Sequence, residues 1–171
     1  LELRAGSETA FDEKIYPAFV GIGSKRFYIS LTPFLSATGL LLAKHGRLHQ
    51  AIALIDPAIE RAMETNDECC LPELLRAKAE ILLFGANPSV EADAEAILKD
   101  ALVRAQHHHF LSWELRCTTT LAALKQRQGQ GQAASDLLTP VYQRFAEGVD
   151  TADLKAARAL ITFLSDAATA H

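Results

Sequence analysis

The chain is 171 residues long and 49% hydrophobic, which suits one domain with a sizeable buried core. Its net charge is −4 at pH 7, with acidic and basic residues interleaved, so it lacks the clustered Lys and Arg of nucleic-acid binding. No apolar run reaches the ~18 residues of a membrane span, and residues 1–10 lack the basic start and apolar stretch of a secretory signal. We expect a cytoplasmic protein with no membrane partner and no direct nucleic-acid partner.

Two further features bear on the origin of the chain. Its three cysteines, two of them adjacent at Cys69 and Cys70, make no disulfide framework and fit a reducing compartment. The chain begins at Leu1 and its only methionine is Met63, so we expect a piece of a longer polypeptide. Upstream domains of that polypeptide would then be possible partners.

Helical periodicity runs through most of the sequence, in which Ala and Leu are abundant and Gly and Pro are sparse. Apolar residues at helical spacing predict helices over 31–45, 48–66, 72–84, 89–107, 112–128, 132–147 and 151–169. The short turns between them imply antiparallel neighbours. Asp150 or Thr151 is placed to cap the last helix.

The predicted helices form three pairs that align with one another. An alanine follows a turn glycine by five residues in two of the pairs, at Ala51 and at Ala134. Pro57 and Pro140 each lie six residues beyond these alanines, inside the second helix of their pair. Because a helix-interior proline costs about 3 kcal/mol, two at equivalent positions indicate duplication of one unit.

Small residues predict where the two helices of each pair touch. A small side chain lets two helix backbones approach to the short end of the ~8–10 Å range of interaxial distances. The facing pairs that we expect are Gly39 with Ala51, Ala79 with Ala94, and Ala122 with Ala134.

These positions resemble the tetratricopeptide pattern of a small residue, a turn glycine and two alanines on the second helix. Lys78 and Lys125 replace apolar residues of that pattern. The resemblance implies an all-α, tetratricopeptide-like α-solenoid of helix pairs at 29–66, 71–108 and 111–148, an N-terminal helical segment at 1–28 and a capping helix at 150–169. The residues that carry it are Leu35, Gly39, Leu42, Gly46, Ala51, Ile55 and Ala58 in the first repeat and Leu121, Ala122, Gly129, Ala134 and Leu138 in the third.

A narrower resemblance covers the chain from about Tyr28 onward. The segments LPELLRAKAEILL, SWELRCTTTLAAL and LLTPVYQRFAEGVDTADLKAARALI are similar to the carboxy-terminal repeats of large bacterial signalling proteins. Those proteins carry a class III nucleotide cyclase or a winged-helix DNA-binding domain, then a STAND-type AAA ATPase, then these repeats. The resemblance implies a non-catalytic regulatory arm that binds a protein or effector and needs no cofactor.

In such a stack the first helix of each pair lines the concave face. The mixture of residues there suits a peptide or protein segment, and Arg76, Arg116 and Arg127 could clamp a carboxylate through paired hydrogen bonds. A solvated charged face is the alternative interpretation. The groove positions that the resemblance implies are Ser36, Leu40, Lys44, Glu73, Arg76, Glu80, Phe84, Arg116, Thr119, Ala123 and Arg127.

Two other functions stay open at this point. One is self-association of the chain into a homo-oligomer. The other is metal or redox sensing in neighbouring turns on one edge of the stack, although three consecutive histidines diverge and also fit a polar helix end. The residues of that alternative are Cys69, Cys70, His107, His108 and His109.

The remaining candidates favour structure over catalysis. The segment GIGSK at 21–25 has the wrong glycine spacing for a phosphate loop and predicts a turn. Cys117 is predicted to be a small buried hydrophobe, and no nucleophile–base or carboxylate pair stands out. Trp113, Tyr142 and Phe145 are predicted to form a core between the third pair and the last helix.

Overall fold

The computed structural model describes residues 28–85, 88–147 and 150–169. The described residues are α-helical and contain no strand, which confirms the prediction of an all-α fold. The helices are α3 (Tyr28–Lys44), α4 (Leu48–Glu64), α5 (Leu71–Leu83), α6 (Pro88–His107), α7 (Leu111–Arg127), α8 (Gly131–Tyr142) and α9 (Ala152–Thr169).

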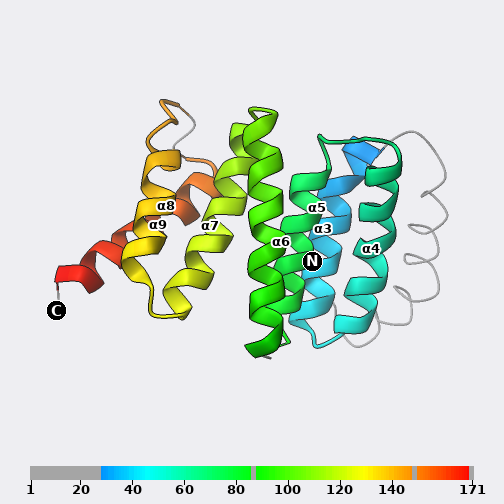
Figure 1. Ribbon diagram of the computed structural model, residues 1–171, viewed down its shortest axis with the longest axis horizontal. Helices are drawn as coiled ribbons and strands as arrows, with labels where there is room; N and C mark the ends of the chain where they lie inside the picture. The colour runs from blue at the N-terminus through cyan, green and yellow to red at the C-terminus, as the bar shows by residue number, and fades with distance from the viewer. Residues whose placement is uncertain (1–27, 86–87, 148–149, 170–171) are drawn as a thin grey trace.

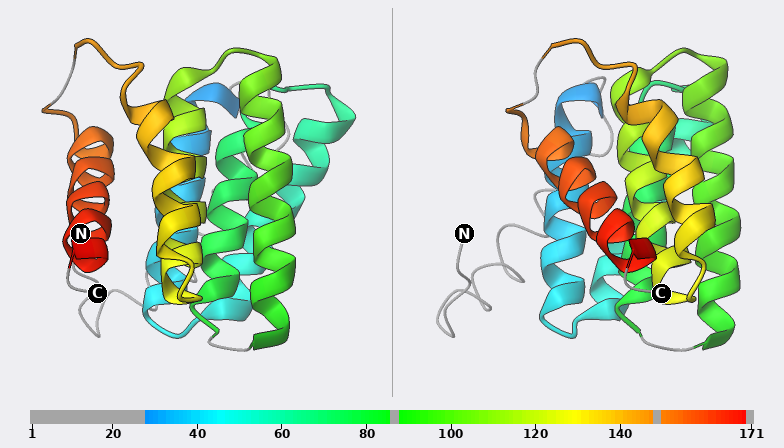
Figure 2. Two further views of the ribbon diagram at one scale, coloured as in Figure 1. Left: turned by 60° about the vertical axis from the view of Figure 1, so that its left-hand side comes forward. Right: turned by 90° about the vertical axis from the view of Figure 1, so that its left-hand side faces the viewer.

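The helices lie in two layers, with α4, α6 and α8 in front of α3, α5, α7 and α9 in Figure 1. Each of α3, α5 and α7 packs against the helix that follows it, and each of α5, α7 and α9 contacts both helices of the preceding pair. Seen from the α9 end, α3 and α9 lie on one side and α6 and α8 on the other (Figure 2). One side of the molecule is therefore made of every second helix.

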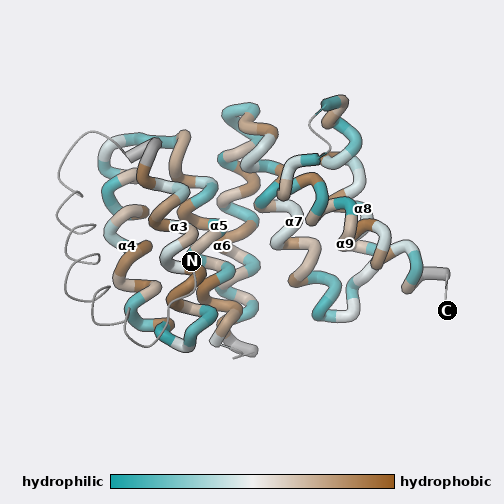
Figure 3. The backbone as a smooth tube through the Cα atoms, turned by 180° about the vertical axis from the view of Figure 1, so that it is seen from behind, coloured by the Kyte–Doolittle hydropathy of each residue, from teal (hydrophilic) through white to brown (hydrophobic). Residues whose placement is uncertain are grey.

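Buried apolar side chains form three clusters that follow one another along the stack. The first joins α3, α4 and α5 through residues such as Leu42, Ile55 and Leu74. The second lies among α5, α6 and α7, and the third among α7, α8 and α9. The turns at the helix ends are largely hydrophilic (Figure 3), so the apolar surface is buried between neighbouring helices.

The small residues lie where helices approach closely. A Cβ on Gly39 would stand 2.9 Å from Ile81 Cδ1 and 3.1 Å from Ile55 Cγ1, so α3 touches both α4 and α5 at this glycine. The nearest neighbours of Gly39 are thus two isoleucines, where we had expected Ala51. In the other pairs, the members of each predicted contact are fully buried and belong to one cluster: Ala79 with Ala94, and Ala122 with Ala134.

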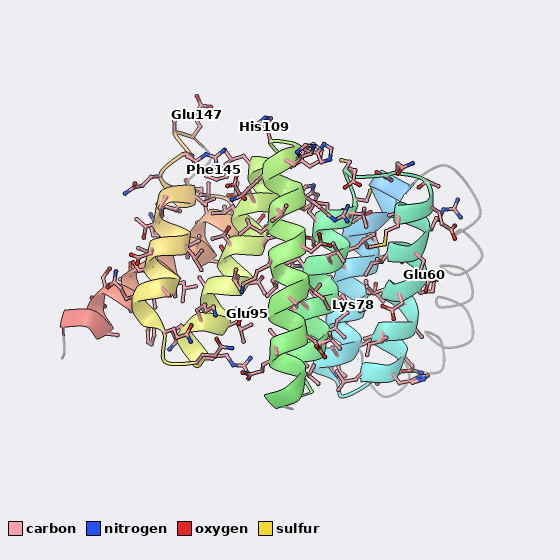
Figure 4. All side chains as sticks on the ribbon, in the orientation of Figure 1. Glu60, Lys78, Glu95, His109, Phe145 and Glu147 are labelled. Carbon is pink, nitrogen blue, oxygen red and sulfur yellow. The ribbon has the colours of Figure 1, made fainter. Side chains whose placement is uncertain are left out.

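Four turns between helices close in the same way. Gly46, Asn66, His109 and Gly129 have φ of +78°, +52°, +56° and +75°. The next residue in each turn donates its N–H to a carbonyl in the last helical turn, at 2.8–2.9 Å. This is the left-handed helix ending that glycine favours and that Asn and His tolerate better than most residues. His109 therefore has a backbone role at the end of α6 (Figure 4).

The helix α8 ends earlier than its sequence suggests. The predicted helix runs to residue 147, whereas α8 stops at Tyr142. Beyond it, Arg144 Nη1 donates to Glu114 Oε2 of α7 at 2.6 Å, and Phe145 packs against the third cluster. These contacts with α7 and the core replace the last turn of helix. At the start of α9, the cap is Thr151, whose Oγ1 accepts the Leu154 N–H at 3.5 Å.

The two lysines that depart from the repeat pattern each reach a carboxylate on the helix before their own. Lys78 Nζ lies 2.8 Å from Asp56 Oδ1 of α4, and Lys125 Nζ lies 2.8 Å from Glu95 Oε1 of α6. Lys99 is also 2.8 Å from Glu95 Oε1. Hydrogen bonds from Lys125 and Lys99 lower the pKa of Glu95 to about 2. Each of these two lysines is thus accommodated by an ion pair between neighbouring helices.

Replacing Glu95 by Gln tests this pairing through its dependence on pH. A lowered folded-state pKa stabilises the fold above the unfolded pKa of about 4.3 and stops doing so as the pH falls through the folded value. We expect Glu95→Gln to lower the free energy of unfolding by about 1 kcal/mol at pH 7. Urea titrations at several pH values should show this difference shrinking below pH ~4. A difference that is constant with pH would contradict the ionic explanation.

Candidate functional site

Two adjoining hollows open on the face formed by α5, α7 and α9. The larger, of about 320 Å³, is lined by Glu80, Leu83, Phe84, Thr119, Thr120, Ala123, Leu124 and Arg127. The smaller, of about 160 Å³, is lined by Arg76, Arg116, Thr119, Thr120, Asp153 and Ala156. Because Thr119 and Thr120 line both, the hollows form one depression, which we call the α5–α7–α9 groove.

The groove gathers most of the predicted binding positions of the second and third pairs. It contains Arg76, Glu80, Phe84, Arg116, Thr119, Ala123 and Arg127. Glu73 lies beneath them and is 1% exposed. The predicted residues of α3 do not line it: Ser36 is buried, Leu40 is half-buried and Lys44 is exposed.

Two residues of the groove were missed because the last helix was interpreted only as a cap. Asp153 and Ala156 of α9 line the smaller hollow. The repeat itself carried the signal, since Ala156 follows Arg116 by the same forty residues that separate Gly39 from Ala79. Applying the period to the last helix would have placed Ala156 on this face.

Five charged side chains form a continuous chain of ion pairs across α5, α7 and α9, which we call the ionic chain. Arg76 donates to both oxygens of Glu73, at 2.9 and 3.0 Å, and its third nitrogen bonds Glu80. Arg116 Nη2 lies 3.0 Å from Glu73 Oε1 and its Nε lies 3.6 Å from Asp153 Oδ1. Glu73 is therefore shared by two guanidinium groups from different helices.

The ionic chain changes the interpretation of the predicted arginine clamp. Burial lowers the pKa of Arg76, but Glu73 and Glu80 outweigh that effect and raise its pKa overall, so the guanidinium stays charged. Arg127 Nη2 lies 3.2 Å from Glu91 Oε1. All three arginines proposed to hold a ligand carboxylate thus hold carboxylates of this chain. A ligand would meet polar groups that are already paired.

Half of the residues that line the larger hollow are apolar. These are Leu83, Phe84, Ala123 and Leu124, and Phe84 is 46% exposed. Thr119 and Thr120 donate their hydroxyl hydrogens to carbonyls one turn back, at 2.7 and 3.1 Å. A hollow lined by apolar side chains together with a few oriented polar groups is typical of a site that receives a side chain of a partner.

The cysteines and histidines lie in neighbouring turns, as predicted. Glu68, beside the cysteines, lies 3.9 Å from His108 Nε2 and bonds Arg104 at 2.9 and 3.0 Å. Cys70, however, is buried in the first cluster, and burial raises its pKa to about 11. Across the described ranges, no three His, Cys, Asp or Glu side chains are arranged to hold a metal ion. The metal-binding form of this alternative therefore has no ligand set among the described residues.

The other candidates have structural positions. Cys117 is fully buried with its Sγ 3.6 Å from the carbonyl of Pro72, which confirms it as a core residue. Tyr142 and Phe145 pack against the third cluster as predicted. Trp113 does not join that cluster: it is half-buried and lies under Arg116, with the guanidinium carbon 5.4 Å from the ring centroid. The GIGSK segment at 21–25 lies outside the described residues.

Comparison with known proteins found no match: no family model, no curated protein and no solved structure resembles this chain significantly. Among the helices described, none is long and apolar enough to cross a membrane. The functional argument therefore depends on the groove and on the sequence pattern.

Proposed function

We propose that the helices form a tetratricopeptide-like solenoid, with α3–α4, α5–α6 and α7–α8 as its pairs and α9 as its cap. Three observations support this proposal: the alternation of the helices between two layers, the contact of each pair with the next, and the shared turn geometry. In such a stack the groove lies on the face made by the first helix of each pair.

The function proposed for this face is binding of a protein or peptide segment, without catalysis. The observation that carries it is the α5–α7–α9 groove, in which predicted binding positions of two pairs and residues of α9 line one depression that includes several apolar side chains. Its paired charges favour a partner that inserts apolar side chains over one recognised chiefly by a carboxylate. The resemblance to carboxy-terminal repeats adds a setting: a cytoplasmic regulatory arm whose partner includes the upstream ATPase, cyclase or DNA-binding module of the same polypeptide.

A random peptide library panned against the chain tests this function. Enriched peptides are expected to bind the wild type and to lose at least tenfold in affinity to Ala123→Arg, because the new side chain fills the larger hollow. Ala96→Arg is the matched control, since Ala96 is an exposed alanine on α6, away from the groove. Peptides that bind Ala123→Arg and the wild type equally would show that the groove is not the binding site.

A further inference from the structure

Each of α5, α7 and α9 turns one face toward the pair of helices that precedes it, and we call this face, and the face of α3 at the same positions of the repeat, the leading face. On α5 this face includes Ile81, which touches Gly39 of α3, and Lys78, which pairs with Asp56 of α4. On α7 it includes Cys117, which contacts the Pro72 carbonyl of α5. With the period of the repeat, the leading faces are Leu71, Leu74, Lys78 and Ile81 on α5; Glu114, Cys117, Leu121 and Leu124 on α7; Leu154, Ala157, Ile161 and Leu164 on α9; and Leu31, Phe34, Thr38 and Leu41 on α3.

The leading face of α3 is open where the other three are buried. Phe34 is 62% exposed, whereas Leu74, Cys117 and Ala157 at the same position are all 0% exposed. Leu31 and Leu41 are only half-buried, in contrast to the fully buried residues at their positions on α5. Phe34 is thus uncovered at the position where its counterparts on the other three helices are fully buried.

The repeat indicates which segment that is. The leading faces of α5, α7 and α9 are each covered by the helix that precedes them in the chain, together with the first helix of that pair. The covering helices carry apolar residues at steps of four and three: Ala51, Ile55 and Ala58 on α4; Ala94, Leu98 and Ala101 on α6; Ala134, Leu138 and Val141 on α8.

The same pattern occurs before α3. Ala51 precedes Ala79 by 28 residues, and Ala94 precedes Ala122 by 28. Counting 28 residues back from Gly39 reaches Phe11, and Phe11, Ile15 and Ala18 repeat the steps of four and three. Pro17 then lies six residues beyond the start of the pattern, as Pro57 and Pro140 do in α4 and α8. The motifs IYPAF at 15–19 and IDPAI at 55–59 differ at only two of five positions.

We propose that residues 11–20 pack on the leading face of α3, as α4 packs on α5, and cover Phe34. Ile15 and Ala18 stand at the positions of the pattern that Ile55 and Ala58 hold in α4. This contact involves the opposite side of α3 from α5 and does not depend on the function of the groove.

Trypsin cleavage after Lys14 in the intact chain tests the proposal, because Lys14 lies within the covering segment. In the wild type this cleavage is expected to be at least tenfold slower than in Phe34→Glu, which places a charge under the segment. Ala18→Glu, which leaves the residues next to Lys14 unchanged, should accelerate it equally. The matched control is Val103→Glu: Val103 on α6 is also 62% exposed and lies away from this face, so cleavage after Lys14 should stay slow.

Cleavage after Arg116, inside α7, reports whether a variant unfolds globally and should remain unchanged in all of them. Equal cleavage after Lys14 in the wild type and Phe34→Glu overturns the proposal. It is also overturned if light scattering shows a wild-type dimer that Phe34→Glu dissociates while cleavage after Lys14 does not change, because a second copy would then cover Phe34.

Discussion

Replacing Glu73 by Gln is expected to lower the free energy of unfolding by about 3 kcal/mol, at the lower end of values for breaking a buried ion pair. Glu73 is 1% exposed and joins Arg76 and Arg116. Arg76 is itself 5% exposed, so it cannot recover by hydration what it loses in pairing. Urea unfolding followed by circular dichroism measures the change, because the midpoint falls while the slope stays constant.

Two comparisons make the Glu73 result specific. Glu80→Gln removes the other partner of Arg76, but the Glu80 side chain is 36% exposed, so we expect a loss of no more than about 1 kcal/mol. The double substitution Glu73→Leu with Arg76→Met removes both buried charges and should be more stable than Glu73→Gln. If Glu73→Gln and Glu80→Gln cost the same, burial of the ionic chain has no special role.

Gly39→Leu is the second substitution from which a large effect is expected. Even a Cβ at this position meets Ile81 and Ile55 at 2.9 and 3.1 Å, and leucine adds three more carbons between α3, α4 and α5. Overpacking of this kind costs about 1–3 kcal/mol, and the better helix propensity of leucine returns less than about 1 kcal/mol. We expect a net loss of about 2 kcal/mol, which a thermal melt would record as a Tm lower by about 4–8 °C.

Two further substitutions show whether the loss in Gly39→Leu comes from crowding between the helices or simply from adding a larger side chain to α3. Ala37→Leu adds bulk at an exposed position of the same helix and should leave Tm nearly unchanged. Ile81→Ala alone costs about 2–5 kcal/mol through the cavity it leaves, but combined with Gly39→Leu it should cost less than the sum of the two. Strict additivity would show that Gly39 and Ile81 do not limit the approach of α3 to α5.

The helices and their pairing could be predicted because their signals are local. Turn glycines, helical spacing and paired prolines lie within a few residues of the boundaries that they mark. The end of α8 could not be predicted, because it depends on a hydrogen bond from Arg144 to Glu114, which lies thirty residues earlier in the chain. His109 is an exception to the rule that local features could be predicted. Its left-handed conformation is local, but a histidine does not by itself indicate such a conformation.

For the groove, the sequence indicated which residues lie there better than it indicated what those residues bind. Glu73 and Arg76 are three residues apart on one helix, so their pairing was available from the sequence, yet both were interpreted as ligand contacts. The link from Glu73 to Arg116 and on to Asp153 depends on how α5, α7 and α9 are packed. No local sequence pattern predicts these ion pairs between different helices.

The turn glycines Gly46 and Gly129 have a consequence for chemical synthesis. Each has a left-handed backbone, and no atom lies within 4 Å of the place where an L-residue would put its Cβ. An L-residue is therefore disfavoured at these positions by its backbone dihedral angles and not by crowding around its Cβ. The preferred dihedral angles of D-alanine are the mirror image of those of L-alanine, so D-alanine would adopt this backbone without strain. It would also reduce the conformational freedom of the unfolded chain. The cost of an L-residue at these two turns therefore comes from its handedness and not from its size.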